Sequence, residues 1–294
     1  MSRAISKGHS TIAVTGFIGI SRQAFHKRLQ SDHNKNDLYN EAEVKVLKSR
    51  EIKSRAGLRS IYYKEQLSSL LGINQFEQQM SARGYALKPY KSFIKTTDSR
   101  GHQYKYPNLI AGMQLREANQ VIVGDITYYR SLDGTLYYIF HFADYYTLEM
   151  KGLLGSKNMD GVNAERCLRQ VFAYNKKGKY DYSMIVHTDA GGQYRSHKFQ
   201  EMLRKAQMRA SHAANCLENG LSERENGIVK NEYLIDYDIK SISHLNRVLN
   251  RIKLQINEVW PSKKLGYRTP KQYAEWIRNV DIKERPIKKV NEEL

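Results

Sequence analysis

The sequence predicts an α/β protein in which a mixed five-stranded sheet with helices is preceded by helical segments. Three features of the chain indicate this fold class. Residues 120–154 are rich in β-branched and aromatic side chains, which favour strands. Residues 160–258 alternate short apolar runs with segments whose apolar residues recur at helical spacing. Residues 11–87 carry helical patterns interrupted by glycine turns, so the helical part comes before the sheet.

The first predicted element is a helix-turn-helix over residues 11–30. An apolar stretch precedes a turn at Gly19 and Ile20, and Ser21 can cap a short basic helix over 22–30. In DNA-binding proteins the second helix of such a motif enters the major groove. The alternative is a capped surface helix with solvated cations. The side chains predicted to contact DNA are Arg22, Gln23, His26, Lys27 and Arg28.

A second helix-turn-helix is expected farther along, after a polar stretch at 31–37 that predicts a linker. It consists of one amphipathic helix over 58–71, a break at Gly72 and a second helix that ends at Gly84. Basic and aromatic residues with scattered Pro and Gly follow, and they predict an extended basic linker.

From Gln120 onward the pattern changes to strands. Asp133 and Gly134 form a strong hairpin signal between two strands, and a third strand over 148–154 completes a meander. The elements expected next are a helix over 160–174, a strand over 182–187, a helix over 196–206, a strand over 207–211, and helices over 219–233 and 243–258. Three antiparallel strands followed by helix, strand, helix, strand and helix is the order of a ribonuclease-H-like domain.

These elements divide the chain into five expected parts. The first two are DNA-binding: a helix-turn-helix-like segment over 1–48 and a second helical segment over 49–95. A basic linker over 96–116 leads to the ribonuclease-H-like catalytic domain over 117–280, and a basic tail occupies 281–294.

The charge of the chain points to a nucleic-acid partner. Of 294 residues, 48 are Lys or Arg and 30 are Asp or Glu, which gives a net charge of +18. Residues 1–120 carry a net charge of +11, whereas residues 121–240 hold 15 carboxylates against 16 cations. A basic chain favours a polyanion, because neutralised phosphates release counterions. The central carboxylates suit a phosphoryl-transfer enzyme, since divalent metals need oxygen ligands.

Composition excludes several classes of protein. Two cysteines, Cys167 and Cys216, are too few for a disulfide framework or a four-cysteine zinc site, and they suit a reducing cytoplasm. The sequence holds no run of 18 apolar residues that would predict a membrane span, and no glycine-rich Walker loop that would indicate ATP binding. We therefore expect a cytoplasmic protein.

Two aspartates are candidates for chemistry. Asp125 and Asp189 each lie where a strand ends or bends, and in the predicted order their strands lie side by side, so the two carboxylates could meet. A third carboxylate from a helix end would complete a cage for one or two Mg²⁺ ions. His187 is expected to support the end of its strand. The third carboxylate stays open among Glu218, Glu223, Glu225 and Glu232.

Four sequence blocks carry a resemblance to a known family. They are VIVGDITYY, IVHTDAGGQYRS, NCLENGLSERENGIVKNEYL and INEVWPSKKLGYRTPKQYAEW. In this order they resemble the DDE catalytic domain of bacterial insertion-sequence transposases, in the retroviral-integrase superfamily. Over about residues 105–278 the chain resembles the second-frame product of the group whose transposase is made from two overlapping reading frames. ISRQAFHKRL also resembles the N-terminal motif of that group.

The resemblance implies catalytic roles for three carboxylates. Asp125 matches the first catalytic aspartate, Asp189 the second, and Glu223 the glutamate. Together they would hold two Mg²⁺ ions, for which Mn²⁺ can substitute. Lys230 lies two helical turns past Glu223, about 10 Å along the same face, and is implied to contact DNA beside the scissile phosphate. Asp144 matches an aspartate that the family does not use as a ligand, which implies a structural role.

Two departures from the family pattern bear on these assignments. The family usually has 35 residues between its second aspartate and its glutamate, whereas 33 separate Asp189 from Glu223 and 35 separate Asp189 from Glu225. Glu223 is preferred because the flanking motif aligns there, and the two glutamates are about 200° apart on a helix, so only one can face the metals. Ala190 stands where the family usually has arginine, which concerns a substrate or structural contact.

The implied function is that of a DDE transposase, which cuts DNA at the ends of a mobile element and joins those ends to new DNA. The implied partners are double-stranded DNA (terminal repeats and target), further copies of the chain in a synaptic dimer or higher oligomer, and an upstream first-frame protein, all at the bacterial nucleoid. Two alternatives remain. One is a transposase-derived protein that acts by occupying DNA without catalysis, and the other is a ribonuclease-H-like nuclease that cuts without joining.

Overall fold

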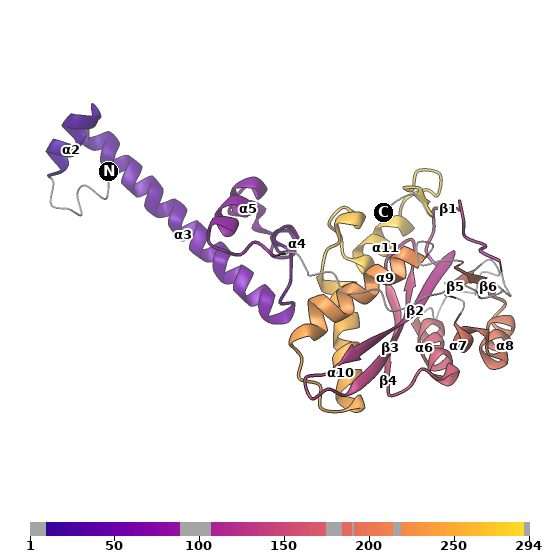
Figure 1. Cartoon of the computed structure of the whole chain (residues 1–294). Helices are drawn as coiled ribbons and strands as arrows, with labels where there is room; N and C mark the ends of the chain where they lie inside the picture. Colours follow the sequence, from indigo (N-terminus) through magenta and orange to yellow (C-terminus); the bar gives the residue numbers. More distant parts are fainter. Residues whose placement is uncertain (1–9, 89–106, 175–183, 190, 214–218, 291–294) are drawn as a thin grey trace. The chain divides into compact units, whose positions relative to one another are not determined.

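The computed structural model describes residues 10–88, 107–174, 184–189, 191–213 and 219–290. It divides the chain into two compact units. The N-terminal unit comprises Met1–Glu51 and Gly57–Lys88, and the C-terminal unit comprises Ile52–Ala56 and Pro89–Leu294. In Figure 1 the helices of the N-terminal unit are indigo to purple, and the sheet and helices of the C-terminal unit run from magenta to yellow.

The N-terminal unit opens with a helix-turn-helix. Helix α2 spans Thr11–Ile18, and α3 begins at Arg22. Gly19 ends α2 in the left-handed region, at a φ of 72°, which glycine adopts without steric cost. The Ser21 hydroxyl accepts a hydrogen bond from the backbone N–H of Ala24 at 3.1 Å. The predicted turn and helix cap are confirmed.

Helix α3 is much longer than the sequence predicts. It spans Arg22–Ile52, so the linker predicted at 31–37 is wrong. Polar side chains in this stretch support the helix through pairs four residues apart, such as Gln30 with Asn34 at 3.2 Å. Farther along, buried side chains recur at helical spacing, at Tyr39, Ala42, Val46 and Ser49. The polar composition favoured a loop, but the spacing of the side chains allows the helix to continue.

The second predicted helix-turn-helix is present with an interrupted first helix. Its elements are α4 (Leu58–Lys64), the 3₁₀ turn η1 (Leu67–Ser69) and α5 (Ile73–Ala82). The single helix predicted over 58–71 is therefore wrong, because Gln66 adopts a left-handed φ of 52° that no continuous α-helix allows. The core of this unit includes Ile61, Tyr62, Leu67, Phe76 and Met80.

The C-terminal unit is built on a mixed five-stranded sheet in the order β4-β3-β2-β5-β6 (Figure 1). The strands span Val121–Arg130 (β2), Leu136–Asp144 (β3), Met150–Ser156 (β4), Ile185–Thr188 (β5) and Arg209–His212 (β6). β2, β3 and β4 pair antiparallel, whereas β5 runs parallel to β2 and β6 parallel to β5. This is the expected ribonuclease-H-like sheet, and the prediction is confirmed.

Helices cover both faces of this sheet. They are α6 (Gly161–Tyr174), α7 (Gly192–Arg195), α8 (His197–Lys205), α9 (Gly220–Gly227), α10 (Ile242–Leu254) and α11 (Pro270–Arg278). Along β4, Gly152 faces Cys167 of α6, whereas Gly155 faces Leu245 of α10. Residues three apart in a strand point to opposite faces, so α6 and α10 lie on opposite sides of the sheet. No helix in the described ranges is long and apolar enough to span a membrane.

Two of these helices end in wider π-helical turns. α9 continues as η3 over Ile228–Tyr233, and α10 continues as η5 over Gln255–Val259. The long helices predicted in these two regions are therefore present, but they are not α-helical to their ends. A π turn shifts the angular phase of the residues that follow. Simple α-helical spacing therefore does not place Lys230 relative to Glu223.

The last described residues return to the beginning of the C-terminal unit. β7 (Lys288–Lys289) pairs antiparallel with β1 (Gln114–Leu115). Arg285 forms an ion pair with Glu117 at 3.0 Å. The segment expected to be a basic tail thus contributes contacts to this unit.

Candidate active site

The two candidate aspartates lie at the same level of neighbouring strands. β2 and β5 are parallel, and Val123 pairs with His187. Two residues farther along come Asp125 within β2 and Asp189 immediately after β5. The prediction that these strands lie side by side is confirmed. The parallel register places Asp125 and Asp189 next to each other across the two strands.

Asp125 resists ionisation in this setting. Its pKa rises from the usual 3.8 to about 7, first because the carboxyl group is buried and second because Asp189 lies nearby. The charge of Glu223 raises this pKa further, whereas a hydrogen bond from Asn226 Nδ2 to Asp125 Oδ2, at 2.8 Å, lowers it. Burial also raises the pKa of Asp189, although the backbone N–H of Gly191 donates to its Oδ1 at 3.0 Å.

The candidate glutamates occupy different surroundings. Glu223 is exposed in the first turn of α9, and its charge acts on Asp125. Glu225 is only 2% exposed, and burial raises its pKa to about 7. Glu232 forms an ion pair with Lys53 at 2.5 Å. Among the described glutamates considered, Glu223 is therefore the one whose charge reaches the first aspartate.

The donor chemistry of the site fits a divalent cation, although the described side chains do not form a finished ligand set. Within the described ranges, no three His, Cys, Asp or Glu side chains lie close enough together to hold a metal ion. Asp125 and Asp189 nevertheless repel each other while largely buried, and a cation between them would relieve that repulsion. Carboxylate oxygens are the ligands that Mg²⁺ prefers. Glu218 and Ala190, both singled out in the sequence, lie outside the described residues.

Lys230 reaches the sheet beside Asp125. Its Nζ donates to Thr127 Oγ1 at 3.0 Å and lies 4.7 Å from the centre of the Tyr128 ring. Burial lowers the pKa of Lys230, and the neighbouring Tyr128 and Asp125 oppose that effect. The ammonium group is thus held against β2, near the first aspartate. Its contact with DNA stays a prediction.

Asn226 is a site residue that the sequence analysis missed. It follows Glu223 by three residues, a spacing that places both on one side of a helix and was the only available signal. At the start of α9, Asn219 Nδ2 donates to the carbonyl oxygen of Gly124 at 3.5 Å. The amide contacts of Asn219 and Asn226 dock α9 on β2. Within β2, Gly124 has no room for a side chain, because an added Cβ would lie 2.2 Å from the Phe142 ring.

Two other polar groups have structural partners, as the sequence predicts. His187 Nδ1 lies 2.9 Å from Ser211 Oγ on β6, which ties the end of β5 to its neighbour. Asp144 is fully buried and accepts hydrogen bonds from the backbone N–H groups of Tyr146 and Thr147, at 3.0 and 2.7 Å. Both side chains stabilise the ends of strands.

The side chains predicted to contact DNA lie at the start of α3 in the N-terminal unit. Phe25 is buried and anchors this end of the helix. The five predicted side chains are all exposed, namely Arg22, Gln23, His26, Lys27 and Arg28. Exposure is what a DNA-contacting surface requires, and their contact with DNA stays a prediction.

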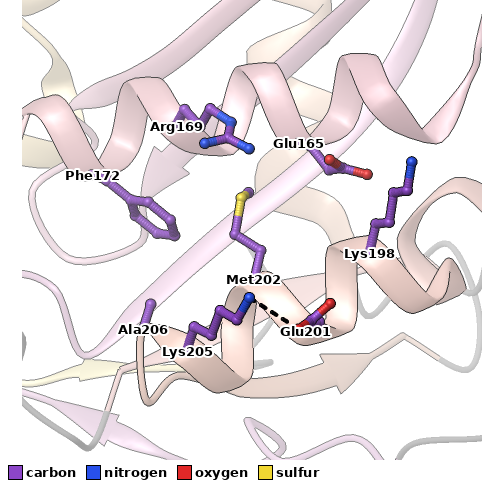
Figure 2. Close-up of a pocket in the computed structure, with 8 residues that line it drawn as sticks. All are labelled: Glu165, Arg169, Phe172, Lys198, Glu201, Met202, Lys205 and Ala206. Carbon is purple, nitrogen blue, oxygen red and sulfur yellow. Dashed lines mark ion pairs between the residues drawn. The ribbon is translucent and has the colours of Figure 1, made fainter.

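A separate hollow of about 490 Å³ lies between α6 and α8 (Figure 2). Charged side chains surround it, and Lys205 forms an ion pair with Glu201 at 3.0 Å. Ile126 packs against the core beneath α6 and α8, so Asp125, its neighbour in β2, points to the opposite face of the sheet. This hollow is therefore distinct from the carboxylate site.

Two protein-family models match the C-terminal unit. A model described as "Integrase core domain" matches residues 116–215, and a second model with the same description matches residues 204–270. Together these matches include Asp125, Asp189 and Glu223.

Several known proteins are similar to the chain in sequence. The transposase for insertion sequence element IS904 of Lactococcus lactis subsp. lactis (strain IL1403) is 27% identical over 201 residues, which are 67% of this chain and 78% of that protein. Transposase InsF for insertion sequence IS3fB of Escherichia coli (strain K12) is 32% identical over 107 residues, or 36% of each protein. The HTLV-2 integrase catalytic core domain in complex with magnesium (trimeric form) is 20% identical with a TM-score of 0.43, over 57% of this chain and 99% of that chain.

Proposed function

The chain belongs to the insertion-sequence transposases with an integrase core domain, as a second-frame product of the two-reading-frame group, and we propose that it catalyses metal-dependent DNA cleavage and strand transfer at the ends of its element. The observation that carries this proposal is the placement of Asp125 and Asp189 at one level of adjacent parallel strands, with the charge of Glu223 acting on Asp125. Paired carboxylates of this kind suit phosphoryl transfer by two metal ions.

In this proposal Asp125, Asp189 and Glu223 hold Mg²⁺ or Mn²⁺. When bound there, the ions would supply activation of the attacking oxygen and charge stabilisation of the leaving oxygen of the phosphodiester. A bound cation would favour the ionised form of Asp125, whose pKa is raised to about 7. Lys230 holds a phosphate of the reacting strand, and the rigid β2 scaffold keeps that phosphate close to the aspartates. Holding the reacting phosphate next to β2 and β5 reduces the entropic cost of bringing the reacting groups together.

The N-terminal part is proposed to recognise the terminal repeats. Its DNA-reading segments are residues 1–48 and 49–95, joined by a basic linker over 96–116 to the catalytic domain over 117–280. The exposed cations at the start of α3 would contact phosphates and base edges.

The proposal includes partners that act at the same DNA. Two element ends must be held together for joining, so we expect a synaptic dimer or higher oligomer, with an upstream first-frame protein as a further partner. A protein that acts on chromosomal element DNA works at the nucleoid, in the bacterial cytoplasm.

The test is a strand-transfer assay with a duplex that ends in the terminal repeat of the element, together with target DNA and Mg²⁺. Asp125→Asn, Asp189→Asn and Glu223→Gln should each abolish cutting and joining, because each removes a charged ligand and keeps the shape. The same proteins should bind the duplex normally in a gel-shift assay. Glu225→Gln is the matched control from the same helix and should remain active.

The outcomes separate the alternatives. Cutting without joining would indicate a ribonuclease-H-like nuclease, and specific binding with neither reaction would indicate a protein that acts by occupying DNA. If Glu223→Gln is active and Glu225→Gln is dead, the third carboxylate is Glu225.

A further inference from the structure

Beyond Val123, one edge of β2 has no strand beside it. β5 pairs with β2 through Val121–Val123, and among the described residues no other strand lies on this side of β2. The part of β2 from Asp125 to Arg130 therefore runs along an open edge of the sheet. Side chains from both faces of β2 can meet one ligand at such an edge, whereas a paired strand would separate the two faces.

The ammonium group of Lys230 lies at this open edge. Its Nζ donates to Thr127 Oγ1 at 3.0 Å and lies 4.7 Å from the centre of the Tyr128 ring. Thr127 projects from the same face of β2 as Asp125, and Tyr128 projects from the opposite face. Lys230 therefore bridges the two faces. A hydroxyl and an aromatic ring do not neutralise its charge, so the ammonium group can still bind a phosphate.

The Tyr128 side chain is exposed at the same edge. It is 49% exposed, whereas the next residue, Tyr129, is 9% exposed and donates from its hydroxyl to the carbonyl oxygen of Tyr237 at 2.9 Å. A single exposed aromatic side chain is common on protein surfaces. Tyr128 differs because its ring lies against the ammonium group of Lys230. It also follows Asp125 by three residues, which is about 10 Å along the strand.

An exposed ring beside a cation suits a nucleotide. Every nucleobase has flat faces that stack on aromatic side chains whatever the sequence, and the cation can bind the phosphate. Inside a duplex, neighbouring bases cover both faces of each base. The last base of a DNA end has one uncovered face, and cutting at the end of a mobile element produces such a base. The open edge of β2 thus offers a ring of the right chemistry near the carboxylates.

We propose that Tyr128 is a nucleobase-binding residue: its ring stacks on the last base of the cut element end, while Lys230 holds the adjacent phosphate. This inference rests on the proposed function, because it takes DNA cut at an element end as the substrate. The stack fixes the strand end relative to Asp125. It tolerates any base, since the ring contacts the flat face and not the hydrogen-bonding edge.

The first test detects the stack without any reaction. The full chain is titrated, in buffer with a chelator, into a duplex that ends at the cleavage point and carries 2-aminopurine as the last base of the cut strand. Stacking quenches the fluorescence of this base, so the parent and Tyr128→Phe should both quench it at saturation. Tyr128→Leu removes the ring and should leave most of the fluorescence. Leu132→Ala, 73% exposed in the same hairpin, is the matched control and should quench like the parent.

The second test asks whether the ring and the base act together. At saturating DNA, Tyr128→Leu should slow strand transfer by up to about 100-fold, because the strand end is no longer aligned with the reacting groups. An abasic last nucleotide should slow the parent by a similar factor. Combining the two changes should slow the reaction no further, since both remove the same contact. Losses that multiply, or equal quenching by the parent and Tyr128→Leu, would overturn the proposal.

Two controls keep the outcomes distinct. Unfolding followed by tryptophan fluorescence shows whether each variant is folded, and Tyr128→Val, which favours a strand, replaces Tyr128→Leu if that variant is not. If quenching depends on Tyr128 but the parent neither cuts nor joins DNA, the nucleobase site stands and the proposed function fails. If the parent joins DNA and both quenching and rate are insensitive to Tyr128, the proposed function stands and the nucleobase site fails.

Discussion

Replacing the first aspartate by asparagine is expected to stabilise the C-terminal unit while it abolishes the proposed chemistry. The Asp125 carboxyl group is buried beside Asp189, and its pKa rises from 3.8 to about 7. Above neutral pH, the native protein therefore carries a charge that the fold disfavours. Asp125→Asn removes this charge and keeps a carbonyl oxygen that can accept the hydrogen bond from Asn226.

The size of the gain follows from the linkage between protonation and folding. A group whose folded pKa is raised contributes stability that is fully present below its unfolded pKa and is lost as pH rises through its folded pKa. For Asp125 this window runs from 3.8 to about 7. A difference of about 3 between the two pKa values corresponds to about 4 kcal/mol. The advantage of Asp125→Asn should therefore grow from near zero at about pH 4 to about 4 kcal/mol above pH 7.

The assay can follow the C-terminal unit alone. The chain has 2 tryptophans, Trp260 and Trp276, and both belong to this unit. Urea unfolding followed by tryptophan fluorescence, in buffer with a chelator, gives the free energy of unfolding of the parent and Asp125→Asn from about pH 4 to about pH 8. Glu275→Gln, which is exposed on α11, is the control, and its difference from the parent should not follow this pH profile.

The refuting result is a difference between parent and Asp125→Asn that stays constant across this window or favours the parent at high pH. Divalent cations give a second measurement. A ligand that binds only the native state stabilises it according to its concentration and affinity. Mg²⁺ should therefore stabilise the parent more than Asp125→Asn, and the difference between them at high pH should shrink.

The remaining predictions concern DNA. Lys230→Ala should slow strand transfer at saturating DNA more than Lys240→Ala does, and it should lower the salt slope of DNA binding by only about one. Lys240 is the control, because its side chain pairs with Asp238 at 2.5 Å. Equal strand-transfer rates of the two variants would exclude the active-site role of Lys230. Replacing Arg22, Lys27 and Arg28 together by alanine should weaken binding to terminal-repeat DNA. It should also lower the salt slope of binding by about three, since each phosphate contact contributes about 0.9 to that slope. An unchanged slope in a salt titration would contradict a phosphate-binding role for these side chains.

The sheet could be predicted because its signals are local. Strand composition, the turn at Asp133 and Gly134, and the alternation of helices and strands are all visible within short windows. The order of these elements then placed the strands of Asp125 and Asp189 side by side, and the parallel register confirms that prediction. Short-range patterns carry this information because secondary structure depends on neighbours in the chain.

The lengths of the helices were harder to predict. Residues 31–37 have a composition typical of a linker, yet α3 continues through them to bury a stripe that begins at Tyr39. The helix expected over 58–71 is interrupted at Gln66, after which Leu67 is fully buried. In both cases packing at a distance overrides the local preference of the chain.

The sequence by itself determined the class of sheet, the two aspartates that lie together on it and the helix that carries the glutamates. Only the tertiary structure decided what surrounds them: it left Glu223 exposed with its charge acting on Asp125, and it buried Glu225. It also brought the Asn226 side chain of α9 to within hydrogen-bond distance of the Asp125 carboxyl group. The physical reason is that burial and hydrogen bonding depend on how distant segments pack, whereas helix and strand patterns depend on residues close in the chain.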